Sequence, residues 1–126
     1  MLKSDDLINK VKLYNKFLNP ETLNKAYKFA VKAHQNQKRD SGDPYVIHPV
    51  AVANILTDLK LDSATIATGL LHDTIEDTFA TYRTIEEEFG KELINLTIFI
   101  LDFGCIQDLL ISKSGIKTKF LFSSDL

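Results

Sequence analysis

The sequence predicts an all-α fold in a single domain. Apolar residues recur at spacings of three and four along most of the chain, helix-capping residues stand at the ends of these stripes, and no alternating strand pattern is flanked by turn-forming residues. A length of 126 residues, with 44% hydrophobic and 25% charged residues, fits one globular domain with its own core. The net charge of −2 is too small, and the apolar fraction too high, for a disordered chain.

The N-terminal part predicts two helices that meet at Asn19-Pro20. Asn19 is a good N-cap and Pro20 suits the first helical position, so one helix ends and another begins here. The two apolar stripes consist of Leu7, Ile8, Val11, Tyr14 and Leu18, and of Leu23, Ala26, Tyr27, Ala30 and Ala33. The second helix is expected to end near Gln37, and residues 38–44 to form a loop because Gly and Pro stand there among polar residues.

Four further helices are expected after this loop. The first is expected to start at Pro49 and the second at Asp62 or Ser63. The third, a short helix, starts at Thr84 in a capping box with Glu87 and ends at Gly90, and the fourth follows Gly90. The apolar positions of the first of these helices are Val52, Ala53, Leu56 and Leu59, those of the second are Ala67, Leu70 and Leu71, and those of the fourth are Leu93, Leu96, Ile100 and Leu101. We expect the domain to comprise residues 1–103, and residues 104–126 to form a divergent, partly disordered tail because Ser and Gly interrupt its apolar residues.

Cysteine usage and the absence of targeting signals indicate a cytoplasmic protein. Cys105 is the one cysteine, which excludes an internal disulfide framework and a cysteine-rich zinc cluster. Asp5 and Asp6 stand where a signal peptide would begin its apolar stretch. The apolar run 96–101 is far shorter than the roughly 20 residues that cross a bilayer. We therefore expect a soluble chain with no membrane contact.

Charge is distributed unevenly along the chain. Residues 1–40 contain nine Lys or Arg against four Asp or Glu, residues 41–92 contain three against ten, and residues 93–126 contain three of each. An acidic middle segment repels a nucleic-acid backbone and favours a bound cation. We expect no nucleic-acid partner, while a phosphorylated small molecule can still lie between a metal ion and the basic segment.

The strongest candidate for chemistry is the segment from His72 to Asp77. Residues four apart lie one above the other on a helix, so His72 is aligned with Glu76 and Asp73 with Asp77. An imidazole and a carboxylate can hold a divalent metal ion, while the second acidic pair is placed to orient or deprotonate water. The alternative is a solvated helix end, although closely grouped like charges favour a bound cation or proton.

Two further histidines and a basic loop complete the candidates. His48 directly precedes Pro49 and therefore lies at a helix entrance, where it either binds a ligand or simply packs. His34 continues an apolar stripe, which indicates a buried, hydrogen-bonded imidazole. The loop with Lys38, Arg39, Ser41 and Gly42 suits phosphates or stacking of a guanidinium group on a base, and a solvated loop is its alternative.

Taken together, these segments resemble the hydrolase domain of RelA/SpoT-type alarmone enzymes, a group of the HD superfamily. The matching blocks, in order, are Ala26-Tyr27, Ala33-His34, Gln37 to Tyr45, His48-Pro49 with Val52-Ala53, Leu70 to Asp73, and Glu76 to Thr78. The resemblance covers about residues 20–96 and implies an HD-domain helical bundle. No Gly-rich phosphate loop, G-x-G-x-x-G, H-E-x-x-H or G-x-S-x-G motif competes with it.

The resemblance implies a hydrolase that removes the 3′-pyrophosphate of guanosine tetra- or pentaphosphate with manganese as cofactor. The products are GDP or GTP and pyrophosphate. The residues carried over by position are the metal ligands His48, His72 and Asp73, the water-positioning Glu76 and Asp77, and the nucleotide-site residues Arg39, Ser41 and Tyr45. The sequence alone does not select manganese, because mixed imidazole and carboxylate sites accept several divalent ions.

The sequence departs from the family pattern in three places. Asp40 stands where the family has a basic residue, and residues 97–103 replace a Gly-Val-Thr-Lys segment. The fourth metal ligand of the family is an aspartate in an Ala-Asp-Arg-Leu-His-Asn block, and the sequence contains no such block. The bundle is therefore expected to be incomplete at its C-terminal end.

These departures leave two functional hypotheses. The first is a small alarmone pyrophosphohydrolase, with Asp102, Asp108, a complementing chain or a second copy of this chain supplying the missing ligand. The second is a truncated, catalytically inactive remnant that acts at most as a binding or assembly partner.

Overall fold

The computed structural model describes residues 1–103, except for the side chains of residues 76, 77 and 99–103. Its helices are α1 (Ser4–Lys12), α2 (Pro20–Ala33), α3 (Ile47–Asp58), α4 (Ser63–Asp77), α5 (Tyr82–Phe89) and α6 (Lys91–Phe103). Within residues 1–103 the pairing of extended backbone is limited to one isolated antiparallel bridge, between Lys38 and Pro44. The prediction of an all-α fold is confirmed. The expected tail, 104–126, lies outside the described residues.

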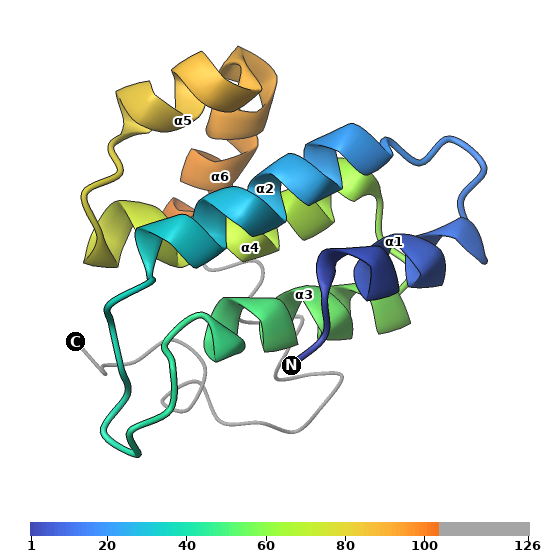
Figure 1. Cartoon of the computed structure of the whole chain (residues 1–126). Coiled ribbons are helices and arrows are strands. Elements are labelled where there is room, and N and C mark those ends of the chain that lie inside the picture. The colour runs from blue at the N-terminus through green and yellow to red at the C-terminus, as the bar shows by residue number, and fades with distance from the viewer. Residues whose placement is uncertain (104–126) are drawn as a thin grey trace.

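Helix α4 is the centre of the bundle. It packs against α2, α3 and α6, while α1 covers α2 and α3, and α5 folds back on α6 (Figure 1). The side chains of Ile66, Ala67, Leu70 and Leu71 on α4 have no exposed surface. Burial of each large apolar side chain contributes about 1.5–3 kcal/mol to stability, so α4 anchors the domain.

Helices α3 and α4 approach each other closely at Gly69. A Cβ atom at this position would lie 2.6 Å from Cδ1 of Leu56 on α3, which is closer than van der Waals contact allows. The two helices are joined by a short turn and run antiparallel, so the start of α3 lies beside the end of α4 (Figure 1). This pairing places residue 48 next to residues 72 and 73.

Capping residues begin α2 and α4 as expected. The side chain of Asn19 accepts a hydrogen bond from the Thr22 N–H at 3.2 Å, and that of Asp62 accepts one from the Thr65 N–H at 2.9 Å. Each carboxyl or amide oxygen thus satisfies a backbone donor that has no partner within the helix. The expectation that Asp62 or Ser63 caps the fourth helix is resolved in favour of Asp62.

Three helix boundaries differ from the expected ones. Helix α2 ends at Ala33, well before Gln37. Helix α3 begins at Ile47 rather than at Pro49, and proline is tolerated in this first turn because its missing N–H has no helical partner there. Helix α5 begins after Thr81, which caps it, so the capping box expected from Thr84 starts three residues earlier.

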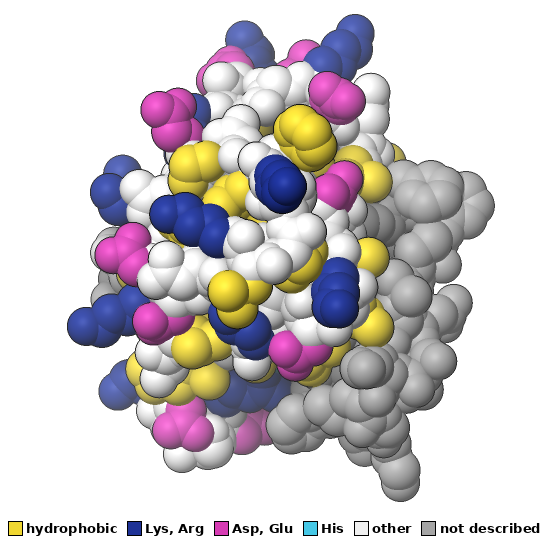
Figure 2. Space-filling view, turned by 90° about the vertical axis from the view of Figure 1, so that its right-hand side faces the viewer, with side chains coloured by type: hydrophobic (Ala, Val, Ile, Leu, Met, Phe, Trp, Pro, Cys, Tyr) yellow, Lys and Arg dark blue, Asp and Glu magenta, His cyan; other side chains and the backbone are white. Residues whose placement is uncertain are grey.

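The surface combines charged and apolar groups. Figure 2 shows cationic and acidic side chains interspersed over one face, with apolar side chains between them. Among the exposed apolar residues are Leu13 and Phe17, in the connection between α1 and α2. None of the helices in the described part of the chain has the length and apolar character needed to cross a membrane.

Candidate metal centre

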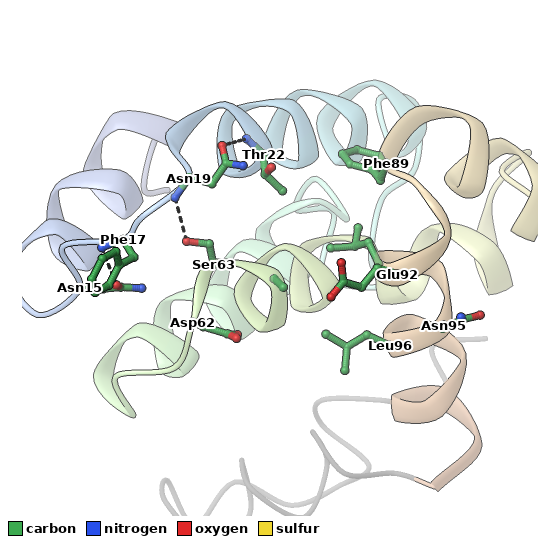
Figure 3. A pocket seen from close by; sticks show the side chains of 12 residues that line it. Asn15, Phe17, Asn19, Thr22, Asp62, Ser63, Phe89, Glu92, Asn95 and Leu96 are labelled. Atoms are coloured by element: carbon green, nitrogen blue, oxygen red, sulfur yellow. Dashed lines mark hydrogen bonds between the residues drawn. The ribbon is translucent and has the colours of Figure 1, made fainter.

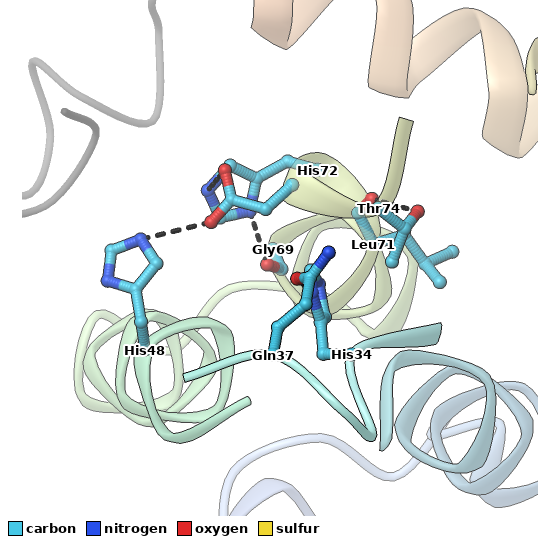
Figure 4. Close-up of polar contacts among 8 residues, drawn as sticks. His34, Gln37, His48, Gly69, Leu71, His72 and Thr74 are labelled. Carbon is cyan, nitrogen blue, oxygen red and sulfur yellow. Dashed lines mark hydrogen bonds and ion pairs between the residues drawn. The ribbon is translucent and has the colours of Figure 1, made fainter. Parts of the chain in front are cut away.

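The structure brings His48, His72 and Asp73 together in the interior. His48 comes from the first turn of α3, and the other two come from the end of α4 (Figure 4). His48 Nε2 lies 3.1 Å from Asp73 Oδ2, and His72 Nε2 lies 3.3 Å from Asp73 Oδ1. One ligand atom from each residue lies within 4.8 Å of the others, and all three residues are buried. These atoms are therefore close enough to bind one metal ion.

The backbone of α4 fixes the tautomer of His72. Its Nδ1 lies 2.5 Å from the carbonyl oxygen of Gly69, and because a carbonyl only accepts hydrogen bonds, Nδ1 carries a hydrogen. In the neutral ring, Nε2 then presents a lone pair, and it faces an oxygen of Asp73. Two acceptors at this distance attract a cation or a proton between them, which is the arrangement that a metal-binding histidine adopts.

Asp73 carries a carboxylate in an enclosed site. Burial by itself would raise the pKa of this carboxyl. The positive charge that His72 carries when protonated, a hydrogen bond from His48, and charge on His48 and His34 outweigh burial and hold the pKa of Asp73 below its ordinary value. Asp73 therefore presents the ionised form that a metal ion requires.

Aromatic contacts connect the basic loop with His48. The buried ring of Tyr45 meets the His48 ring edge to face, with centroids 6.0 Å apart and planes at 68°. The Arg39 guanidinium carbon lies 5.9 Å from the centroid of the Tyr45 ring, within the range of a cation–π interaction. Tyr45 therefore contacts both the side chain expected to bind nucleotide and a candidate metal ligand.

The remaining predicted site residues lie in the loop and at the end of α4. Ser41 is exposed, and its hydroxyl donates to a carboxylate oxygen of Asp43 at 3.0 Å within the turn. Glu76 and Asp77 are the last two residues of α4, one helical turn beyond the His-Asp pair, and their side chains lie outside the described part. The side chain of Asp102 and the whole of Asp108 also lie outside it.

His34 is buried and hydrogen-bonded, which confirms the interpretation of its sequence pattern. It is 1% exposed, and its Nδ1 donates to Oε1 of Gln37 at 2.7 Å. Sequence reasoning missed Gln37 and Gly69 as neighbours of the site. A glycine within an apolar helix was an available signal for Gly69, and for Gln37 the available signal was its place at the start of the matching block from Gln37 to Tyr45.

A pocket lies elsewhere, at the start of α4. Its volume is about 890 Å³, and α6 and the connection between α1 and α2 also line it (Figure 3). Three of its polar residues are engaged in local hydrogen bonds, because the Asn19 side chain accepts from the Thr22 N–H and the Asn19 N–H donates to the Ser63 hydroxyl. The groups with metal-binding chemistry lie near the opposite end of α4, so we place the candidate site there.

A buried cluster of two histidines and one aspartate, with a His-Asp pair on the central helix, defines an all-α domain of the HD type. The HD domain family model matches residues 26–116, and the chain belongs to this family. The match extends beyond residue 103, the boundary expected from the sequence.

The chain is similar to RelA/SpoT-type enzymes, as its motifs indicated. It is 53% identical over 121 residues to "GTP pyrophosphokinase rsh" of Brucella melitensis, covering 96% of this chain and 16% of that protein. It is 55% identical over 76 residues to a GTP pyrophosphokinase of Myxococcus xanthus, covering 60% of this chain and 10% of the relative. It is 59% identical over 71 residues to a putative chloroplastic GTP diphosphokinase, RSH1, of Arabidopsis thaliana, covering 56% of this chain and 8% of the relative. The chain thus spans a small part of the relatives that it matches.

Proposed function

We propose that the chain is a metal-dependent pyrophosphohydrolase that converts guanosine tetra- or pentaphosphate to GDP or GTP and pyrophosphate. The observation that carries this proposal is the convergence of His48 Nε2, His72 Nε2 and the Asp73 carboxylate in a buried site. The names of the relatives refer to GTP, which supports a guanosine nucleotide as the substrate.

The donor set suits a divalent cation, and we propose Mn²⁺ on the basis of the family resemblance. Two imidazole nitrogens and one carboxylate are ligands that several divalent transition metals accept. Such an ion supplies Lewis-acid activation of water and neutralises charge at phosphorus. His48, His72 and Asp73 would hold it, with the hydrogen bond from His72 to Gly69 fixing one imidazole.

The residues around this centre receive the following proposed roles. Glu76 and Asp77 position the attacking water and take its proton, since they lie one turn beyond the metal-binding pair. Arg39 and Ser41 contact the guanosine nucleotide, and Tyr45 forms a wall of its pocket. In the reaction, the water oxygen bonds to phosphorus, the bond from phosphorus to the 3′ oxygen breaks, and a proton is delivered to that oxygen.

Among the side chains that the structure describes, His48, His72 and Asp73 form the cluster and no fourth protein ligand joins them. A complementing chain or a second copy of this chain can provide it, and we propose such an assembly in the cytosol, without a nucleic-acid or membrane partner. The same observation favours the second candidate function, that of a catalytically inactive binding or assembly partner. A site with fewer anionic ligands binds metal more weakly and orients its ligands less well.

Pyrophosphate release from guanosine tetraphosphate in the presence of Mn²⁺ tests the proposal. We expect the wild-type chain to release pyrophosphate, and His72→Ala to abolish the release because it removes a ligand. Glu87→Gln, on the exposed face of α5, is the matched control and should retain wild-type activity. If the wild type is no faster than His72→Ala, the inactive binding partner is the better description.

A further inference from the structure

We propose that His34 is a positioning residue that holds the Tyr45 ring in place for both His48 and Arg39. The inference rests on the proposed metal centre and extends it to a residue outside the proposed metal ligands and nucleotide contacts. Its basis is a continuous set of contacts from the end of α2, through the loop, to the start of α3.

Contacts other than the one with Tyr45 fix the orientation of the His34 ring. The residue caps the C-terminus of α2 and is 1% exposed, so its ring has little freedom. The hydrogen bond from Nδ1 to Gln37 Oε1, at 2.7 Å, sets the rotation of the ring. The backbone carbonyl oxygen of Gln37 also accepts a hydrogen bond from the backbone N–H of Tyr45, at 2.9 Å. Gln37 thus ties the His34 ring and the Tyr45 backbone to each other.

The His34 ring then supports one face of the Tyr45 ring. Their centroids lie 4.8 Å apart with planes inclined by 31°, a tilted arrangement within the distance range of favourable aromatic pairs. The Tyr45 ring contacts His48 edge to face and lies beneath the Arg39 guanidinium. A tilt of this ring would therefore change the position of a metal ligand and of a nucleotide-binding group together.

Two substitutions distinguish the contribution of the His34 ring from that of its hydrogen bond to Gln37. His34→Asn keeps an N–H donor for Gln37 but removes the ring, whereas His34→Phe keeps a ring and removes the donor. Substitution of a residue that supports a metal ligand weakens binding about 10–100-fold, and because His34 acts through Tyr45 we expect a loss of about three- to tenfold for His34→Asn. His34→Phe should bind Mn²⁺ more tightly than His34→Asn and less tightly than the wild type.

The measurement is the dissociation constant of Mn²⁺, determined from the electron paramagnetic resonance signal of the free ion. Val11→Ala is the matched control, because Val11 is fully buried on α1 and its truncation lowers stability without touching the aromatic contacts. It should leave the Mn²⁺ dissociation constant unchanged. Wild-type affinity in His34→Asn, an equal loss in Val11→Ala, or tighter binding by His34→Asn than by His34→Phe would each overturn the inference.

A second measurement tests the positioning role in the metal-free protein. The nuclear magnetic resonance signals of the His48 ring sense the orientation of the Tyr45 ring, so His34→Asn should shift them and Val11→Ala should not. Unchanged signals in His34→Asn would also overturn the inference. A wild type that fails to bind Mn²⁺ would refute the proposed metal centre, while these signals would still decide the role of His34. A wild type that binds Mn²⁺ without hydrolysing the nucleotide would refute only the proposed activity.

Discussion

His72 donates a hydrogen bond from Nδ1 to the carbonyl oxygen of Gly69, three residues earlier on α4, at 2.5 Å. Gly69 also permits the close approach of α3 to α4, because a Cβ atom there would collide with Leu56. One glycine therefore contributes to two features of the site, the tautomer of one imidazole and the proximity of the helix that carries His48.

Gly69→Ala is expected to destabilise the domain. The new methyl group would lie 2.6 Å from Leu56 Cδ1, and Leu56 is itself fully buried. Overpacking costs about 1–3 kcal/mol, which exceeds the roughly 0.5–1 kcal/mol that alanine gains over glycine within a helix. Urea denaturation should show a lower free energy of unfolding.

The double variant Gly69→Ala with Leu56→Ala provides the control. Removal of the Leu56 side chain relieves the collision, so the two changes should be less than additive. Additive losses, or a Gly69→Ala protein at least as stable as the wild type, would contradict the role assigned to this close approach.

Mn²⁺ is expected to stabilise the folded chain through His48. A ligand that binds only the folded state adds about 2.7 kcal/mol to the free energy of unfolding at a concentration of 100 times its dissociation constant. The melting temperature should rise on addition of Mn²⁺ and fall again with a chelator. Under the same conditions, His48→Ala should show a much smaller rise.

The surface variant Glu87→Gln is the control for nonspecific binding of cations to acidic side chains. It should be stabilised by Mn²⁺ as much as the wild type. An equal rise in melting temperature in His48→Ala would show that the ion binds elsewhere.

Arg39→Ala is expected to weaken nucleotide binding more than Lys38→Ala does. Both variants remove one positive charge from the same loop, but Arg39 has the contact with the Tyr45 ring. A cation–π contact is worth about 0.5–1 kcal/mol at exposed sites and holds the guanidinium group in place before the nucleotide binds, so a further increase of up to two- to fivefold in the dissociation constant is expected for Arg39→Ala. Calorimetric titration with guanosine tetraphosphate measures the two dissociation constants. Equal losses of affinity in Arg39→Ala and Lys38→Ala would mean that the Tyr45 contact has no role in binding.

Tyr14 is expected to make the stability of the domain depend on alkaline pH. Its hydroxyl donates to the carbonyl oxygen of Leu61 at 2.6 Å, and burial, followed by the negative charge of Asp62, raises its pKa above 10.0. A raised pKa in the folded state gives a contribution to stability that is complete below the pKa of the unfolded chain and is lost as pH rises through the folded value. Tyr14→Phe should therefore cost about 1 kcal/mol at neutral pH, and the cost should shrink above pH 10.

Asp62→Asn separates the two causes of the shift in the pKa of Tyr14. Asparagine is also a good N-cap, so α4 should remain capped while the negative charge is removed. Titration by tyrosinate absorbance, with Tyr14→Phe subtracted, should give a lower pKa for Tyr14 in Asp62→Asn than in the wild type. An unchanged pKa would mean that the charge of Asp62 has no influence.

The sequence by itself determined the all-α class, the cap of α2, the buried state of His34 and the adjacency of His72 to Asp73, and it narrowed the cap of α4 to Asp62 or Ser63. These features depend on residues close together in the chain, where helical periodicity and capping chemistry act directly. The predicted start of α3 at Pro49 was wrong by two residues, because proline is also tolerated within the first turn of a helix.

Only the tertiary structure decided that His48 Nε2 lies 3.1 Å from an Asp73 oxygen, 25 residues away along the chain. Periodicity identifies the apolar face of a helix but not the helix against which that face packs or the distance between the two axes. That distance depends on side-chain volumes across the contact, here Gly69 against Leu56. For the same reason the ring contact between His34 and Tyr45 became visible only once α2, the loop and α3 were placed together.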